Sequence, residues 1–158
     1  MDVYDIIRDA EGLRLEVYDD ATGKPVNVGD TCRGNLTIGY GHTSPGLTPG
    51  MVIDKPQAEK FLIQDVLIAS AAASRIISEL DWLPIDLVRQ AAIIDMVFTL
   101  GQGGFAKFSH TIWSIRFHDW DASSANVLAS EWATKQAVRR ARRDANMLKT
   151  GEWPTISL

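Results

Sequence analysis

The sequence predicts an α+β fold that is mostly helical and contains one small antiparallel sheet near the N-terminus. Short alternating runs separated by turn residues are confined to residues 13–50, where LRLEVY, PVNV and LTIGY are typical of strands. Helical periodicity with capping residues precedes this stretch and fills most of the chain from residue 54 onward. Neither an internal repeat nor a low-complexity tract interrupts this pattern.

The first predicted helix covers residues 2–11. Asp2 is its expected N-cap, and Gly12 stands where a glycine commonly ends a helix. The helix therefore ends immediately after Glu11, which places this carboxyl at the negative end of the helix dipole.

The predicted elements group into two lobes of one domain, residues 1–158. Residues 13–60 form the β-rich lobe, and a long helix of about residues 54–80 joins it to the helical lobe. Residues 1–12 and 72–158 make up the helical lobe, because the first helix is too short to be stable without packing on later helices.

The composition is that of a globular protein, with 46% hydrophobic and 23% charged residues. The most apolar stretch, residues 61–77, contains Asp65 and Arg75, so no stable membrane insertion is expected. The N-terminal segment is acidic and lacks the apolar core of a signal peptide, which predicts a cytoplasmic location. Cys32 is the only cysteine, so an intrachain disulfide is excluded.

Two carboxyls are the first candidates for chemistry. The helix dipole favours the neutral form of Glu11, as a general acid requires, whereas Asp20 lies in a polar turn and is expected to be ionised. Such a pair across a cleft between lobes is typical of glycoside hydrolases. On spacing alone, a solvated glutamate and a solvated aspartate are the stronger interpretation, and Asp19 competes with Asp20.

The motif NLTIGYGHT, residues 35–43, adds a further signal. With E11-x8-D20, it closely resembles the phage-type lysozyme (endolysin) family. DKPQAEKFLIQDV is similar to the start of that family's interlobe helix, and VRQAAIIDMVFTLG to its central buried helix. The resemblance implies a lysozyme-like two-lobe fold and an enzyme that hydrolyses, with inversion, the β-1,4 bond between N-acetylmuramic acid and N-acetylglucosamine.

The resemblance also implies catalytic roles. Glu11 would be the general acid, Asp20 the second carboxylate, and Thr37 would hold the attacking water against Asp20. Asp20 rather than Asp19 has the offset of nine residues from Glu11 that the resemblance implies. Sixteen residues, 21–36, separate Asp20 from Thr37, more than in the simplest family members. Thr37 lies beside Asp20 if this enlarged hairpin keeps its register, and otherwise loses the water-positioning role.

Further residues are assigned by the same resemblance. The expected substrate-binding residues are Phe98, Thr111, Asn126 and Arg140. For Phe98 a position in the core is the alternative, and for Arg140 a surface position. His42 is expected to form a structural ion pair with Asp65 rather than to act as a base. No cofactor or metal is implied, and HDWD at 118–121 is interpreted as a helix end followed by an aspartate N-cap.

The expected partner is peptidoglycan. The RRARR run at 139–143 is interpreted first as a solvated helix face, next as a surface attracted to the anionic cell wall, and last as a nucleic-acid site, because the chain has a net charge of −4. No nucleic-acid partner is expected, and a monomer is the default.

The simplest biology is an endolysin for host cell lysis. It waits in the host cytoplasm until a separate membrane-disrupting protein releases it, and then acts on peptidoglycan in the periplasm or cell wall. Three alternatives stay open: a lysozyme of a phage tail, a bacterial wall-remodelling lysozyme, and a non-catalytic peptidoglycan-binding relative.

Overall fold

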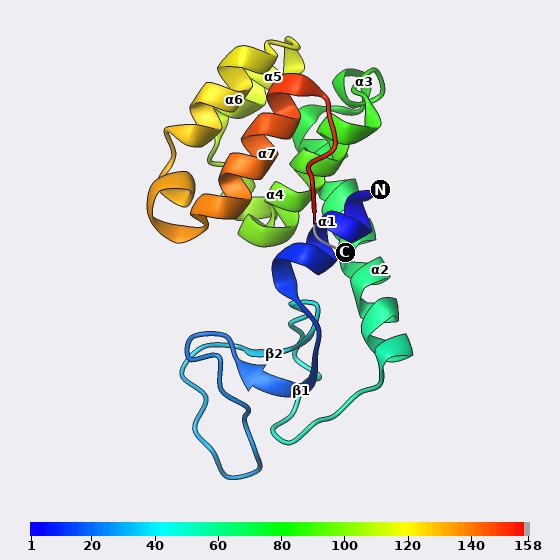
Figure 1. The fold of residues 1–158 in the computed structure, drawn as a ribbon, viewed down its shortest axis with the longest axis vertical. Coiled ribbons are helices and arrows are strands. Elements are labelled where there is room, and N and C mark those ends of the chain that lie inside the picture. Colours follow the sequence, from blue (N-terminus) through cyan, green and yellow to red (C-terminus); the bar gives the residue numbers. More distant parts are fainter. Residues whose placement is uncertain (157–158) are drawn as a thin grey trace. The chain divides into compact units, whose positions relative to one another are not determined.

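The fold is that of a mostly helical α+β protein, as the sequence predicts. A computed structural model describes residues 1–156. Its elements are α1 (Val3–Glu11), β1 (Arg14–Asp19), β2 (Leu36–Gly39), α2 (Lys55–Ile77), α3 (Glu79–Trp82), α4 (Leu87–Phe105), α5 (Ser109–Arg116), α6 (Trp120–Leu128), the π-helix η1 (Trp132–Gln136) and α7 (Val138–Thr150) (Figure 1). The chain forms two compact units, a β-unit (Ile7–Asp65) and a helical unit (Met1–Ile6 with Val66–Leu158).

Helix α1 begins and ends where local capping rules place its ends. The Asp5 N–H donates to Asp2 Oδ1 (3.1 Å), and the Asp2 N–H donates to Asp5 Oδ2 (3.0 Å), so each side chain satisfies the other's backbone donor. Gly12 adopts φ +68°, and its N–H donates to the Arg8 carbonyl (3.0 Å). Glu11 is consequently the last helical residue.

The β-unit is built on one antiparallel strand pair (Figure 1). Tyr18 of β1 lies opposite Thr37 of β2, and Asp19 lies opposite Leu36. Alternation along the strands directs apolar side chains to one face. A small core forms there from Val17, Ile38 and Leu47, with Leu36, Met51, Ile53 and Phe61 packed against it.

The predicted strand PVNV, residues 25–28, is wrong: this segment makes only an isolated bridge to Tyr18. The Val26 N–H still donates to a β1 carbonyl at 3.0 Å. Beyond it, the Asp30 carboxylate accepts from the Asn27 N–H at 2.8 Å and turns the chain. The extended part of residues 25–28 is therefore too short to pair with β1 as a regular strand.

In the helical unit, α7 packs against α4 and α6, and α6 packs against α5 (Figure 1). Most of the buried side chains of this unit are apolar, and they include Met96, Phe105, Ile115, Val127 and Leu148. None of the helices within residues 1–156 has the length and apolar character needed to cross a membrane.

The predicted end of the long helix differs from the structure, and α4 contains an interruption. Asp54 caps α2 as expected, through its carboxylate and the Gln57 N–H (2.8 Å), but the helix ends at Ile77 rather than near residue 80. Ser78 adopts φ 87°, which a right-handed helix does not allow. Gly101 (φ 69°, ψ 162°) interrupts α4, and helical structure then resumes as far as Phe105.

Candidate active site

Glu11 ends α1 with its carboxyl against the turn that follows β2. A Cβ atom added to Gly41 would lie 2.8 Å from Glu11 Oε2 and 3.0 Å from its Cδ, closer than real contacts allow. Gly41 also adopts φ +79°, a conformation that L side chains rarely take. The second glycine of TIGYGH therefore makes room for the carboxyl of Glu11.

An ion-pair network fixes both α1 and this turn. Arg8, three residues before Glu11, contacts Glu59 of α2 through Nη2 and Oε2 at 2.7 Å. The Tyr40 hydroxyl donates to Glu59 Oε1 at 3.0 Å. These two partners hold the pKa of Glu59 below its usual range despite its partial burial. Tyr40 directly precedes Gly41, so the network supports the turn against which Glu11 packs.

Asp20 is exposed at the end of β1, and its carboxylate is held by one residue. The Asn35 N–H donates to Oδ1 at 2.7 Å, and the Asn35 side-chain Nδ2 donates to Oδ2 at 3.0 Å. Gly34 lies next to the same carboxylate with no room for a side chain, since a Cβ atom added to it would lie 2.0 Å from Asp20 Oδ1. Gly34 and Asn35 were not identified from the sequence, although Asn35 opens the NLTIGYGHT motif.

Thr37 returns to the neighbourhood of Asp20 through the enlarged hairpin. It is buried on β2, and its hydroxyl donates to the Asn35 carbonyl at 3.2 Å. The same carbonyl accepts the Asp20 N–H at 3.1 Å. The hairpin therefore keeps a register in which one peptide group connects Thr37 to Asp20.

Tyr18 of β1 is close enough to both Glu11 and Asp20 for their charges to affect its pKa. Burial raises the pKa of Tyr18, and the negative charges of Glu11 and Asp20 raise it further, whereas Arg14 lowers it. The Arg14 guanidinium lies over the Tyr18 ring, 4.4 Å from its centroid. The tyrosine two residues before Asp20 is thus a member of the site that the sequence did not reveal.

Asp19 has a structural role, because its carboxylate is used in hydrogen bonds to the backbone. It is buried, and its carboxylate accepts backbone N–H groups from Ala21 (2.9 Å), Arg33 (2.8 Å) and Gly34 (3.0 Å). These hydrogen bonds hold the pKa of Asp19 below its usual range. Asp19 therefore contributes fully to the free energy of unfolding at any pH above the pKa of an aspartate in the unfolded chain. This contribution is lost as the pH falls through the lower pKa that Asp19 has in the folded protein. Asp19 fastens together both ends of the loop between the strands.

His42 and Asp65 lie in contact within the β-unit, with His42 Nδ1 2.8 Å from Asp65 Oδ2. The His42 ring stacks on Phe61 at 4.1 Å between ring centroids. Burial raises the pKa of Asp65, and the contact with His42 opposes this effect. The TIGYGH turn is thereby attached to α2.

Replacing Gly41 with Ala is expected to lower activity more than its effect on stability would suggest. The new methyl group must displace the Glu11 carboxyl, and the positive φ adds a strain of about 1–2 kcal/mol. Gly23→Ala is the matched control, because Gly23 has φ +70° with open space around it. Thermal unfolding and rates of peptidoglycan hydrolysis should separate the variants; equal activities would contradict the packing role of Gly41.

Arg140 belongs to a buried ionic cluster that we define as Asp95, Arg140, Arg143 and Asp144. Arg140 donates through Nε and Nη2 to both oxygens of Asp95, each at 2.7 Å. Arg143 contacts Asp95 and Asp144, and its Nη1 donates to the Ile6 carbonyl at 2.9 Å. Asp95 is fully buried, and the charges of both arginines hold its pKa below its usual range despite the burial.

This cluster corrects the interpretation of RRARR as a solvated face. The side chains of Arg140 and Arg143 are only 11% and 12% exposed, whereas Arg139 and Arg142 are exposed. Residues three apart share one face of a helix, so α7 presents two of its arginines to Asp95.

Asp144→Asn is expected to make stability less dependent on pH. Burial raises the pKa of Asp144 well above its usual value, and the charge of Asp95 raises it further. Its contribution to the free energy of unfolding is fully present below the unfolded pKa of about 3.9 and is lost as the pH rises through the folded value. Urea unfolding should show the variant gaining stability relative to the parent as the pH rises from about 4 to 7; parallel pH profiles would contradict this.

Thr111 and Asn126 both line a hollow of about 680 Å³ in the helical unit. Asn126 Nδ2 donates to Ser114 Oγ at 3.1 Å, and Thr111 is buried. The lining also includes Trp132, whose buried Nε1 has no hydrogen-bond partner in the described part of the chain. Phe98 is half-buried and lies 5.8 Å from the Arg140 guanidinium, measured to its ring centroid.

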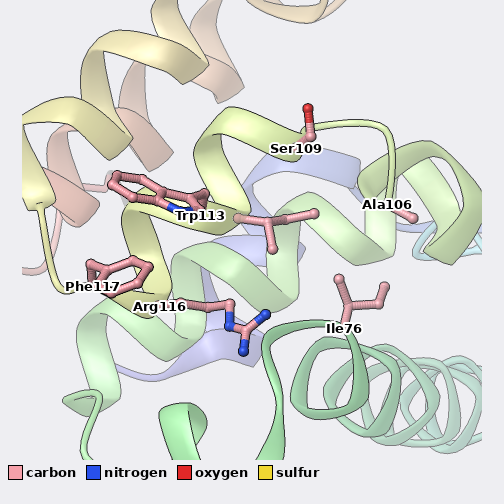
Figure 2. A pocket seen from close by; sticks show the side chains of 7 residues that line it. Ile76, Ala106, Ser109, Trp113, Arg116 and Phe117 are labelled. Atoms are coloured by element: carbon pink, nitrogen blue, oxygen red, sulfur yellow. The ribbon is translucent and has the colours of Figure 1, made fainter.

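A second hollow, of about 550 Å³, lies beside α5. Figure 2 shows Trp113 and Phe117 together, with Ile76 and Ala106 lining another part of the hollow. The two aromatic rings are exposed, and their centroids are 4.6 Å apart. Arg116 pairs with Asp81 at 2.8 Å, and none of the lining residues that the structure describes carries a carboxyl group.

Glu11, Asp20 and Thr37 all belong to the β-unit: Glu11 ends α1, Asp20 directly follows β1, and Thr37 lies on β2. Within residues 1–156 no group of three or more His, Cys, Asp or Glu side chains is placed to hold a metal ion. HDWD contains a helix cap, since the Asp119 carboxylate accepts the Ala122 N–H at 3.0 Å. This arrangement is suited to chemistry by two carboxyls, as in glycoside hydrolases.

Comparison with known proteins agrees with that class. Residues 8–145 match the phage lysozyme family, and the chain belongs to it. The chain is also similar to the pre-baseplate central spike protein Gp5 of Enterobacteria phage T4. The two are 27% identical over 176 aligned positions, which cover 96% of this chain and 28% of that relative. The chain thus spans little more than a quarter of the relative's length.

Proposed function

We propose that the protein is a peptidoglycan lysozyme that cuts the β-1,4 bond between N-acetylmuramic acid and N-acetylglucosamine. The observation that carries this proposal is the pair of differently held carboxyls: Glu11 packed against Gly41, and Asp20 held by Asn35. Membership of the phage lysozyme family supports the substrate class.

In the proposed reaction, Glu11 donates a proton to the glycosidic oxygen as the bond from that oxygen to the muramic acid C1 breaks. A water molecule attacks C1 from the opposite face, and Asp20 accepts its proton. Thr37 helps to hold this water. The configuration at C1 is thereby inverted. We also propose that four residues contact the glycan or its peptide: Phe98, Thr111, Asn126 and Arg140.

The test is digestion of purified peptidoglycan followed by mass spectrometry of the products. The proposal requires fragments that end in a reducing N-acetylmuramic acid. NMR of the first product formed from soluble glycan strands should show the α-anomer, as inversion demands. A reducing N-acetylglucosamine, or tight wall binding without cleavage, would overturn the proposed reaction.

We further propose that the protein is an endolysin that waits in the host cytoplasm until a membrane-disrupting protein releases it. Expression in the bacterial cytoplasm should then leave cells intact until chloroform permeabilises the membrane, after which turbidity should fall. The similarity to the phage T4 spike protein favours one alternative, a lysozyme carried by a virion. Recovery of the chain in purified phage particles, rather than free in the lysate, would favour that alternative.

A further inference from the structure

We infer that Asn35 is the positioning residue of the proposed active site, and that its side-chain amide sets the orientation of the Asp20 carboxylate. This inference rests on the proposed function. It gives a role to the end of the enlarged hairpin, which carries Arg33, Gly34 and Asn35 back to β1.

The contacts of Asn35 with Asp20 constrain the carboxylate at two points. The backbone N–H binds Oδ1 at 2.7 Å, and the side-chain Nδ2 binds Oδ2 at 3.0 Å. One hydrogen bond would leave the carboxylate free to pivot about that oxygen, whereas two set its plane. Of the two polar atoms of an amide, only the nitrogen donates a hydrogen bond, so the Asn35 side chain turns Nδ2 toward the carboxylate.

The lone pairs that remain are those a water molecule needs. A carboxylate has about four acceptor sites, and Asn35 occupies two of them. The same residue receives the Thr37 hydroxyl through its carbonyl, at 3.2 Å. Asn35 therefore contacts both Asp20, the proposed base, and the Thr37 hydroxyl, which is proposed to hold the water. A displacement of Asn35 would disturb both of these groups.

Asn35 itself is held in place by the loop that precedes it. Asp19 binds the N–H groups of Arg33 (2.8 Å) and Gly34 (3.0 Å), and the Asp20 N–H donates to the Asn35 carbonyl at 3.1 Å. The close approach of Gly34 to Asp20 Oδ1 leaves no space for a side chain between them. The two consecutive aspartates thus have different roles. Asp19 holds the loop in place through hydrogen bonds, and Asn35 of that loop orients the Asp20 carboxylate.

The experiment compares Asn35→Ala, Asn35→Asp and the control Asn27→Ala on soluble, uncrosslinked glycan strands. Asn27 is exposed in the same loop and makes its hydrogen bond to Asp30 through the backbone. Asn35→Ala is expected to lower kcat about 10- to 100-fold, because a small misplacement of a reacting group is costly, while KM and Tm stay close to the parent values. Asn35→Asp should lower kcat further, since a second carboxylate replaces the donor.

The outcomes separate this inference from the proposed function. A parent protein that releases no reducing ends overturns the lysozyme proposal itself. If the parent is active and Asn35→Ala retains its kcat, only the positioning role fails. The positioning role also fails if Asn27→Ala loses as much activity as Asn35→Ala, or if the loss in Asn35→Ala appears in KM alone.

Discussion

Replacing Glu11 with Gln is expected to lower the rate of peptidoglycan hydrolysis by at least about 100-fold, the lower limit of what a general acid contributes. The amide keeps the shape of the side chain next to Gly41 but cannot supply a proton to the glycosidic oxygen. The release of reducing ends from purified peptidoglycan measures the effect.

Glu16→Gln is the matched control, because Glu16 is an exposed glutamate of β1 in the same unit. It makes the same chemical change, from a carboxyl to an amide, in the β-unit and should leave activity within about twofold of the parent, as expected for a surface substitution. Full activity in Glu11→Gln with an unchanged Tm would remove Glu11 from the mechanism.

Asp95→Ala is expected to destabilise the protein by about 3–5 kcal/mol, because it leaves two arginines in the buried ionic cluster without their shared carboxylate. For a chain of this size, such a loss lowers Tm by roughly 6–20 °C. Thermal and urea unfolding both measure it.

An exposed ion pair provides the control. Asp121 contacts Lys149 at 3.5 Å, and their side chains are 83% and 60% exposed. Asp121→Ala should therefore cost no more than about 1 kcal/mol. If Asp95→Ala and Asp121→Ala lose similar amounts of free energy of unfolding, the buried contacts of Asp95 with Arg140 and Arg143 matter no more for stability than an exposed ion pair.

The elements governed by local rules could be predicted from the sequence. The caps of α1, the glycine that follows Glu11 and the cap of α2 depend on residues within one or two turns of each other. The same holds for the alternation of β1 and β2. The end of α2 was misplaced because Ser78, the residue that breaks the helix, is not one whose type requires a positive φ.

The surroundings of the two carboxyls could not be predicted. The contact of Asn35 with Asp20 and that of Gly41 with Glu11 depend on how loops of many residues close. The ionic cluster had left a signal: Asp95 interrupts the apolar run AAIIDMVF, and a buried acid needs partners. RRARR offered two arginines with helical spacing, but the sequence does not show which face of α7 is covered.

The fastening of the loop by Asp19 bears on how the hairpin can change length during evolution. Its tip, residues 27–31, is exposed, whereas both ends are attached to a single carboxylate. Insertions at the tip add little closure entropy, about 0.6 kcal/mol for each doubling of loop length. Sequence drift, or a grafted peptide tag, should therefore be tolerated there without displacing the groups around Asp20.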